Sequence, residues 1–197
     1  MRTLNKNIEK ILNRNKNREQ AQKIQTNKYG KHYITDGYIL VEFKEDIPEL
    51  SNYTILDYEQ SFKLDDVFEN LTDAVDFKDL AEQDKFILQN VKHYNKFFNE
   101  CVKGQEGYYQ SPYVVLLDTF YNSVLVNEVV KFIGVKDLKD TKVSYKIIGA
   151  NEHQKILVLE NDTLRICLMP IRFDEKFFDG IQTNLDLFKT YIESKGL

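Results

Sequence analysis

The histidines and carboxylates of the chain are the side chains that could carry acid–base chemistry. His32, His93 and His153 are spread along the 197 residues, and Asp36 lies in the stretch KHYITDGYILVEF (residues 31–43). Acid–base partners must come within hydrogen-bonding reach, and metal ligands usually come clustered. A hydrolase that used His32, Asp36, His93 and His153 would therefore require the fold to bring four distant residues together.

Short motifs of the common enzyme classes are missing from the sequence. It contains no GxSxG, GxxxxGKS/T, GxGxxG or HExxH, which are typical of hydrolases, phosphate-binding loops, dinucleotide-binding folds and zinc proteases. The two cysteines, Cys101 and Cys167, lie far apart and have no CxxC partner. This spacing favours reduced packing residues over a disulfide or a zinc cluster. We therefore expect no enzymatic activity, no metal and no cofactor.

Asp36 has a second interpretation, as the corner of a β-hairpin. Residues 31–35 and 38–44 are rich in Tyr, Ile, Val and Phe, which favour strands. In the second strand Ile39, Val41 and Phe43 should face one side and Tyr38, Leu40 and Glu42 the other. Asp36-Gly37 between them is a dipeptide that accepts the positive φ angles of a type I′ turn. In this interpretation Asp36→Ala costs about 1 kcal/mol or less of stability and no turnover.

The composition indicates one soluble, globular domain. Apolar residues make up 42% of the chain and charged residues 29%, and a chain of this length can bury a sizeable core without disulfides. No run approaches 18 consecutive apolar residues, and the first ten residues, MRTLNKNIEK, lack the apolar core of a signal peptide. We expect a cytoplasmic protein without membrane association.

The charges are divided unevenly along the chain. Residues 1–31 contain nine Lys or Arg and two Glu, which gives +7, so the other 166 residues carry −11 of the net charge of −4. A chain of this kind is repelled by nucleic acid everywhere except along its basic segment.

The basic segment has the pattern of a two-faced helix. Its apolar residues, Leu4, Ile8, Ile11 and Leu12, have the spacing of one helix face. Lys6, Lys10, Arg14 and Arg18 recur at every fourth position and form a basic stripe. The candidate DNA-binding set is Arg2, Lys6, Lys10, Arg14, Arg18 and Lys23. Several asparagines lower the helix propensity, so the end of this helix can fray. The alternative is a solvated basic face or tail.

The remaining sequence predicts an α+β fold. We expect a helical, acidic insertion over 57–110 with a long helix at about 76–102, and a strand after Pro112 followed by a helix up to Gly134. Strands are expected at 142–148, 155–160 and 164–171, with a turn at Asn161-Asp162. A last helix has Ile181, Leu185, Phe188 and Ile192 on one face. The resulting order, a helix and then strands, occurs once at the start and once at the end.

Two stretches of the chain together resemble bacterial sliding clamps, the ring-shaped processivity factors of DNA replication. The first is YITDGYILVEF, a strand pair around Thr-Asp-Gly. The second runs from YVVLLDTFYNSVLVNEVVKFIG through KVSYKII and KILVLEN to LRICLMPIR, which resembles the last half-domain of a clamp. Its ending has the clamp pattern Met-Pro-apolar-Arg at Met169, Pro170, Ile171 and Arg172. The resemblance covers roughly residues 30–44 and 113–172.

The resemblance implies a fold and a function. It implies antiparallel sheets with helices packed on one face, in a single clamp-like domain over residues 1–172 that carries the 57–110 insertion, and a C-terminal helix over 173–197. It implies a non-catalytic protein whose basic helix slides on duplex DNA through phosphate contacts and which tethers a replication protein or a clamp-binding peptide. A ring would need several copies, so a homo-oligomer is left open.

The stretch QTNLDLF (residues 182–188) is similar to the short peptides that dock on clamps. In that interpretation the partner-binding residues are Met169, Pro170, Ile171, Arg172, Leu185, Leu187 and Phe188. The alternative is that Leu185 and Phe188 pack the last helix onto the body of the protein. An interaction protein that uses a clamp-like module to bind another protein, such as a clamp or a nuclease, is the alternative function.

Overall fold

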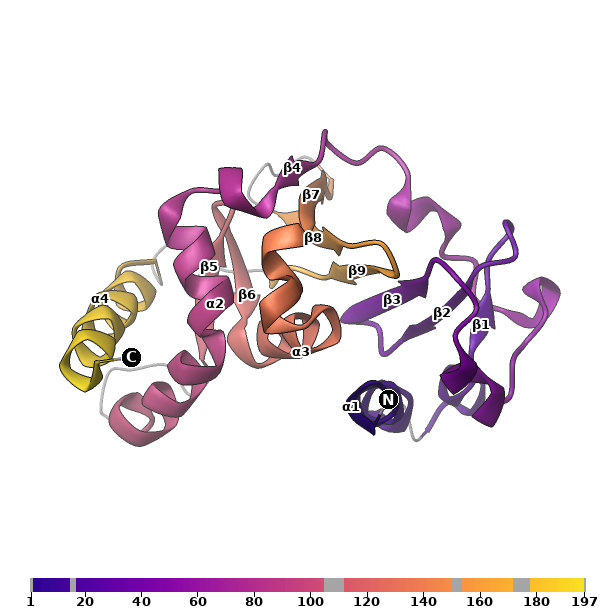
Figure 1. The fold of residues 1–197 in the computed structure, drawn as a ribbon, viewed down its shortest axis with the longest axis horizontal. Helices are drawn as coiled ribbons and strands as arrows, with labels where there is room; N and C mark the ends of the chain where they lie inside the picture. The colour runs from indigo at the N-terminus through magenta and orange to yellow at the C-terminus, as the bar shows by residue number, and fades with distance from the viewer. Residues whose placement is uncertain (1, 15–16, 105–111, 150–153, 172–177, 197) are drawn as a thin grey trace.

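The chain folds into an α+β structure (Figure 1). The computed structural model describes residues 2–14, 17–104, 112–149, 154–171 and 178–196. Its α-helices are α1 (Arg2–Arg14), α2 (Glu82–Phe97), α3 (Ser123–Ile133) and α4 (Phe178–Lys195). Within these described ranges, no helix combines the length and the hydrophobicity needed to cross a lipid bilayer.

The main sheet has seven strands in the order β1-β2-β3-β9-β8-β7-β4, and all neighbouring strands are antiparallel. These strands are β1 (Gln25–Thr26), β2 (His32–Thr35), β3 (Ile39–Phe43), β4 (Val75–Asp76), β7 (Lys142–Ile147), β8 (Lys155–Glu160) and β9 (Leu164–Leu168). A separate hairpin consists of β5 (Tyr113–Leu116) and β6 (Thr119–Asn122). The expected antiparallel α+β class is therefore confirmed.

A helix followed by three strands occurs twice in this sheet. The first unit is α1-β1-β2-β3 and the second is α3-β7-β8-β9. Their last strands, β3 and β9, pair antiparallel in the interior of the sheet, with Ile39 opposite Leu168 and Phe43 opposite Leu164. The repeated order that the sequence pattern predicts is confirmed, and the two units meet at their last strands.

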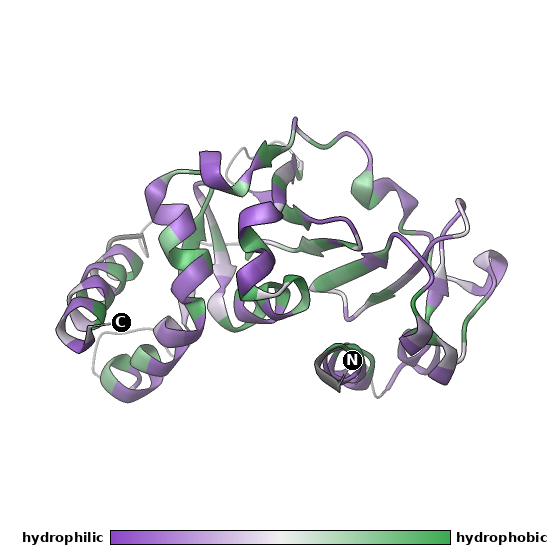
Figure 2. Ribbon diagram, in the orientation of Figure 1, coloured by the Kyte–Doolittle hydropathy of each residue, from purple (hydrophilic) through white to green (hydrophobic). Residues whose placement is uncertain are grey.

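One face of the sheet is covered by α1 and α3 (Figure 1). On β3, Ile39, Val41 and Phe43 point into the core beneath these helices, as the alternation predicts. The predicted apolar face of α1 is also confirmed, since Ile8 and Ile11 are fully buried. Figure 2 shows hydrophobic residues along β3 and mixed hydropathy along α1 and α2, as expected for helices that pack on one side.

The other face is covered by the acidic segment, which is less helical than expected. Leu40 belongs to a second apolar cluster on this face, against which Leu64, Val67, Phe68 and Leu71 pack. Residues 57–76 form short 3-10 turns, including η4 (Asp65–Phe68), and the edge strand β4. The segment stays extended because its apolar side chains must reach across the sheet.

The predicted long helix begins later than its periodicity indicates. α2 starts at Glu82, and a π-helical turn over Phe98–Val102 completes the helical stretch. Residues 75–77 cannot join this helix, because they bond to β7 and to the residue before it. Val75 pairs with Val143, and the Phe77 N–H donates to the Thr141 carbonyl at 2.9 Å.

The turn at Asp36 is not the predicted type I′ turn. The turn runs from Asp36 to Ile39, so its central residues are Gly37 and Tyr38, and Gly37 has φ +89°. A positive φ at the first central residue is typical of type II′. Asp36 is the first turn residue, and its Oδ1 accepts the N–H groups of Tyr38 at 2.9 Å and Ile39 at 2.8 Å.

The type I′ geometry occurs instead between β5 and β6. Leu117 and Asp118 have φ of 51° and 57°, although left-handed backbone costs a residue such as Leu about 1–2 kcal/mol. The Leu117 N–H donates to Asp84 Oδ1 at 3.2 Å, and its carbonyl accepts from Lys155 Nζ at 2.8 Å. Because this hairpin uses residues 119–122, α3 starts at Ser123 and not after β5 as predicted.

The C-terminal helix packs onto the same core as the sheet. Leu185 and Phe188 are each 1% exposed, whereas Leu187 is 47% exposed. The Phe188 ring lies 5.3 Å from the Tyr94 ring and 5.6 Å from the Phe97 ring, both on α2. Of the two interpretations of QTNLDLF, the packed helix is the one that this burial supports.

We predict that Phe188→Ala lowers the free energy of unfolding by about 3–5 kcal/mol, because it leaves a cavity in the aromatic cluster. Leu187→Ala is the matched control, and it should change stability by less than about 0.5 kcal/mol. Urea unfolding followed by circular dichroism measures both. Equal, small effects would mean that α4 is detached from the body in solution.

Candidate functional site

A group of four charged side chains joins α1, α3 and the turn between β2 and β3. Glu128 on α3 accepts hydrogen bonds from Lys10 and Arg14 of α1, one on each carboxylate oxygen. The second nitrogen of the Arg14 guanidinium donates to Asp36 Oδ2 at 2.5 Å. We call Lys10, Arg14, Asp36 and Glu128 the Arg14 network.

The Arg14 network fixes the role of Asp36. Its side chain is fully buried, with one oxygen bound to two backbone N–H groups and the other to Arg14. Three of the about four lone-pair sites of this buried carboxylate are occupied in this way, so it orders the turn and the helix end. Asp36 is therefore a structural residue, as the hairpin interpretation expects. Besides the turn it also holds Arg14 of α1.

Glu128 is a residue that the sequence analysis missed. It is 5% exposed and accepts from two cations. A signal for it exists in the sequence, since Glu128 follows Leu125 by three residues and precedes Phe132 by four, which places it on the apolar face of α3. A charged residue on a core-facing helix position requires a partner.

The predicted basic stripe on α1 is shorter than expected. Lys6 is exposed and the Lys10 side chain is 53% exposed, whereas the Arg14 side chain is 26% exposed and lies between two carboxylates. The structure describes α1 up to Arg14, and Arg18 lies beyond it in extended backbone and not on the stripe. Lys23 bonds to Glu19 at 2.9 Å. The Arg2 side chain lies outside the described part of the structure.

Lysines of three different helices form a cationic surface. Burial lowers the pKa of Lys131 on α3, and the charges of Lys10 on α1 and Lys92 on α2 lower it further. Burial and the charge of Arg14 likewise lower the pKa of Lys10. α3 packs against both α1 and α2, so these lysines lie on neighbouring helices and Lys131 senses the charges of the other two. With Lys6, one turn before Lys10, we call Lys6, Lys10, Lys92 and Lys131 the lysine surface.

Most of the charge on the lysine surface is uncompensated. Lys6, Lys92 and Lys131 form no ion pair with any residue that the structure describes. The Arg14 network, in contrast, contains two cations and two carboxylates and is neutral. The helices α2, α3 and α1 follow one another (Figure 1), and α3 contacts the other two, so the lysine surface spans three neighbouring helices.

The two stretches that carry the clamp resemblance lie side by side. Their strands β3 and β9 are paired, and the Met169 N–H donates to the Tyr38 carbonyl at 2.9 Å. Tyr38 is 62% and Met169 36% exposed, with Pro170 and Ile171 half-buried beside them. We call Tyr38, Met169, Pro170 and Ile171 the Tyr38–Met169 patch; Arg172 lies outside the described residues. Tyr38 was not among the predicted partner-binding residues, because its neighbour is more than 100 positions away.

His32 and His93 are not brought together. His32 Nδ1 lies 3.3 Å from Thr26 Oγ1 and its Nε2 lies 3.4 Å from Asp46, whereas His93 belongs to α2. β2 and α2 lie on opposite sides of α3 (Figure 1), and His153 is outside the described residues. Across the described ranges, no group of three or more His, Cys, Asp or Glu side chains could hold a metal ion.

Comparisons with protein-family models, with curated proteins and with solved structures gave no match. The two surfaces are therefore interpreted from their own geometry. One is the lysine surface over three helices, and the other is the Tyr38–Met169 patch at the end of β3 and β9.

We predict that Asp36→Ala lowers the free energy of unfolding by about 3 kcal/mol, because it leaves Arg14 and two backbone N–H groups without their acceptor. This exceeds the cost of about 1 kcal/mol that a simple turn residue implies. Asp36→Asn keeps an oxygen for the backbone and should lose less. Asp162→Ala, in the exposed turn between β8 and β9, is the control. Urea unfolding with an equal loss at both positions would contradict the network's role.

Proposed function

We propose that this protein is a non-catalytic, sliding-clamp-like module that binds duplex DNA through its phosphates and tethers a second protein. The observation that carries the proposal is the lysine surface, to which α3 and the two helices packed against it, α1 and α2, contribute Lys131, Lys10 and Lys92. The neighbouring position of the two clamp-like stretches adds support.

Unpaired lysines that lie close together favour a polyanion. Each ammonium is a compact charge without the planar fork of arginine, so it attracts phosphate without fixing the geometry of a base edge. Binding of this kind releases counterions from the DNA and weakens steeply with salt. Charges spread over three helices also allow several phosphates to be contacted at once, which suits movement along the backbone.

The Arg14 network decides which lysines contribute most. The charges of Lys10 and Arg14 are balanced by Glu128 and Asp36, so the net attraction for DNA comes mainly from Lys6, Lys92 and Lys131. Of the predicted DNA-binding set, Lys6 and Lys10 remain on the proposed surface, and Lys92 and Lys131 are added to it. Arg14 holds the helix in place.

The Tyr38–Met169 patch is the proposed docking place for the tethered protein. Tyr38 presents a large ring with a polar end, and Met169 is a flexible apolar side chain that adapts to different partners. A partner peptide with the order Gln-Leu-Asp-Leu-Phe would place its Leu and Phe against these two residues. The chain's own LDLF stretch does not fill this role, because Leu185 and Phe188 are buried in the core.

We expect the triple variant Lys6→Gln, Lys92→Gln and Lys131→Gln to weaken binding of a random-sequence DNA duplex and to reduce the slope of log K against log salt by about 2–3. Fluorescence anisotropy at several salt concentrations measures this. The control triple variant is Lys63→Gln, Lys78→Gln and Lys146→Gln, which has the same net charge but lies on or next to the segment that covers the other face. An equal loss in both triple variants, or binding independent of salt, would rule out the lysine surface.

We expect the double variant Tyr38→Ala and Met169→Ala to weaken binding of a labelled Gln-Leu-Asp-Leu-Phe peptide by about tenfold, because it removes the exposed apolar contacts. Tyr29→Ala is the control, since Tyr29 is 70% exposed and lies outside the patch. Unchanged peptide affinity would remove the patch from the proposal. Peptide binding by a protein that binds no DNA would instead favour an interaction module that borrows the clamp-like fold.

A further inference from the structure

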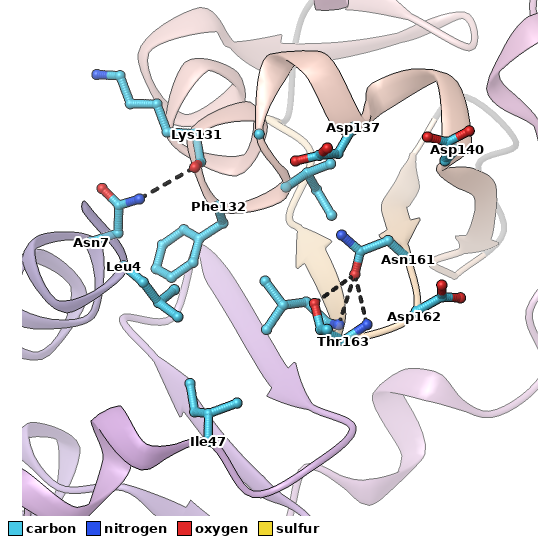
Figure 3. Close-up of a pocket in the computed structure, with 13 residues that line it drawn as sticks. Leu4, Asn7, Ile47, Lys131, Phe132, Asp137, Asp140, Asn161, Asp162 and Thr163 are labelled. Carbon is cyan, nitrogen blue, oxygen red and sulfur yellow. Dashed lines mark hydrogen bonds between the residues drawn. The ribbon is translucent and has the colours of Figure 1, made fainter. Parts of the chain in front are cut away.

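A cleft of about 650 Å³ opens between the start of α1 and the end of α3. Its other walls are η7 (Val135–Asp140) and the turn between β8 and β9 (Figure 3). The side chains of Leu4, Phe132 and Ile47 point toward one another and form its apolar wall. We call this space the α1–α3 cleft, and its volume suits one or two large side chains.

The opposite wall of the cleft is negatively charged. Asp137, Asp140 and Asp162 line it, are all exposed, and form no ion pair with any described residue. The last turn of α3 also ends at the cleft, and its carbonyl groups carry the negative end of the helix dipole. Lys131 lines the cleft through its backbone, but its ammonium group points away from the apolar wall (Figure 3).

The combination of the two walls restricts the ligand. A nucleic acid or an acidic peptide would be repelled by three carboxylates, and a purely apolar ligand would leave them without partners. The Asn161 Oδ1 atom is not available to a ligand, because it already accepts hydrogen bonds from the Thr163 and Leu164 N–H groups at 3.0 and 2.9 Å. A ligand must therefore supply both apolar surface and positive charge.

We propose that the α1–α3 cleft docks a peptide segment of a partner protein in which a large apolar side chain is flanked by Lys or Arg. The apolar side chain packs against Leu4, Ile47 and Phe132, and the flanking cations pair with Asp137, Asp140 and Asp162. The proposal does not depend on DNA binding, because it uses different residues of opposite charge. A partner held here would leave the Tyr38–Met169 patch free.

The test uses the full chain and three labelled hexapeptides in fluorescence anisotropy. Gly-Lys-Leu-Phe-Lys-Gly carries both required features, Gly-Glu-Leu-Phe-Glu-Gly reverses the charge, and Gly-Lys-Ser-Ser-Lys-Gly lacks the apolar pair. The first peptide should bind at least about tenfold more tightly than either of the others. The double variant Asp140→Lys and Asp162→Lys should weaken the first peptide by about tenfold and should tighten the charge-reversed peptide.

The control for charge is Glu59→Lys with Asp57→Lys, two exposed acids in the segment that covers the other face. It should leave the affinity of the first peptide unchanged. Equal binding of the two lysine peptides would overturn the proposal, since it would show attraction of charge alone. Equal effects of the two double variants would overturn it as well. Nuclear magnetic resonance shifts on the first peptide should appear at Leu4, Ile47 and Phe132, and shifts confined to Tyr38 and Met169 would assign the peptide to the other surface.

Discussion

The pairing of Arg14 with two carboxylates is the constraint on which the arrangement of helices depends. A buried carboxylate is tolerated only when a cation and hydrogen-bond donors satisfy it. Arg14 satisfies Asp36, which orders the turn of the first unit, and Glu128, which lies on the helix of the second unit. One guanidinium therefore sets the position of α1 relative to both halves of the sheet. The same contact holds α1 and α3 side by side.

The pairing of β3 with β9 has a comparable effect at the level of the backbone. It joins the two helix-and-strands units into one sheet and brings Tyr38 beside Met169. The segment 57–76 then closes the second face, so that β3 is buried on both sides. The parts of the molecule that remain accessible to a partner are the outer sides of the helices and the two ends of the strands.

Much of the fold follows from local patterns in the sequence. The alternation of Ile39, Val41 and Phe43 and the three- and four-residue spacing in α1 and α4 depend on one face being apolar, and both are confirmed. The turns could not be predicted as well, because a shift of one residue changes the turn type: Gly37 supplies the first central residue and not the second. The extended course of 57–76 could not be predicted from local pattern either, because the segment packs on a sheet face that other parts of the chain form.

The candidate site was less predictable than the fold. The charge count located Lys6 and Lys10 correctly on an exposed basic helix, but Lys92 and Lys131 lie in the acidic part of the chain, where a running charge count hides them. Arg14 is basic and follows the same four-residue spacing as its neighbours on the stripe. It differs from them in its pairing with Glu128, 114 positions away, which the spacing does not reveal. Periodicity reports which residues share a face, and not which distant carboxylate faces them.

The two edge strands, β1 and β4, consist of two residues each. An edge of that length offers few free backbone N–H and C=O groups, so it is a poor template for adding a strand from another chain. The sheet is thereby protected against uncontrolled fibre-like stacking. For the same reason, an assembly of several copies through the edges of this sheet has little main-chain hydrogen bonding to draw on, and its geometry would be set by side chains, which single substitutions can tune.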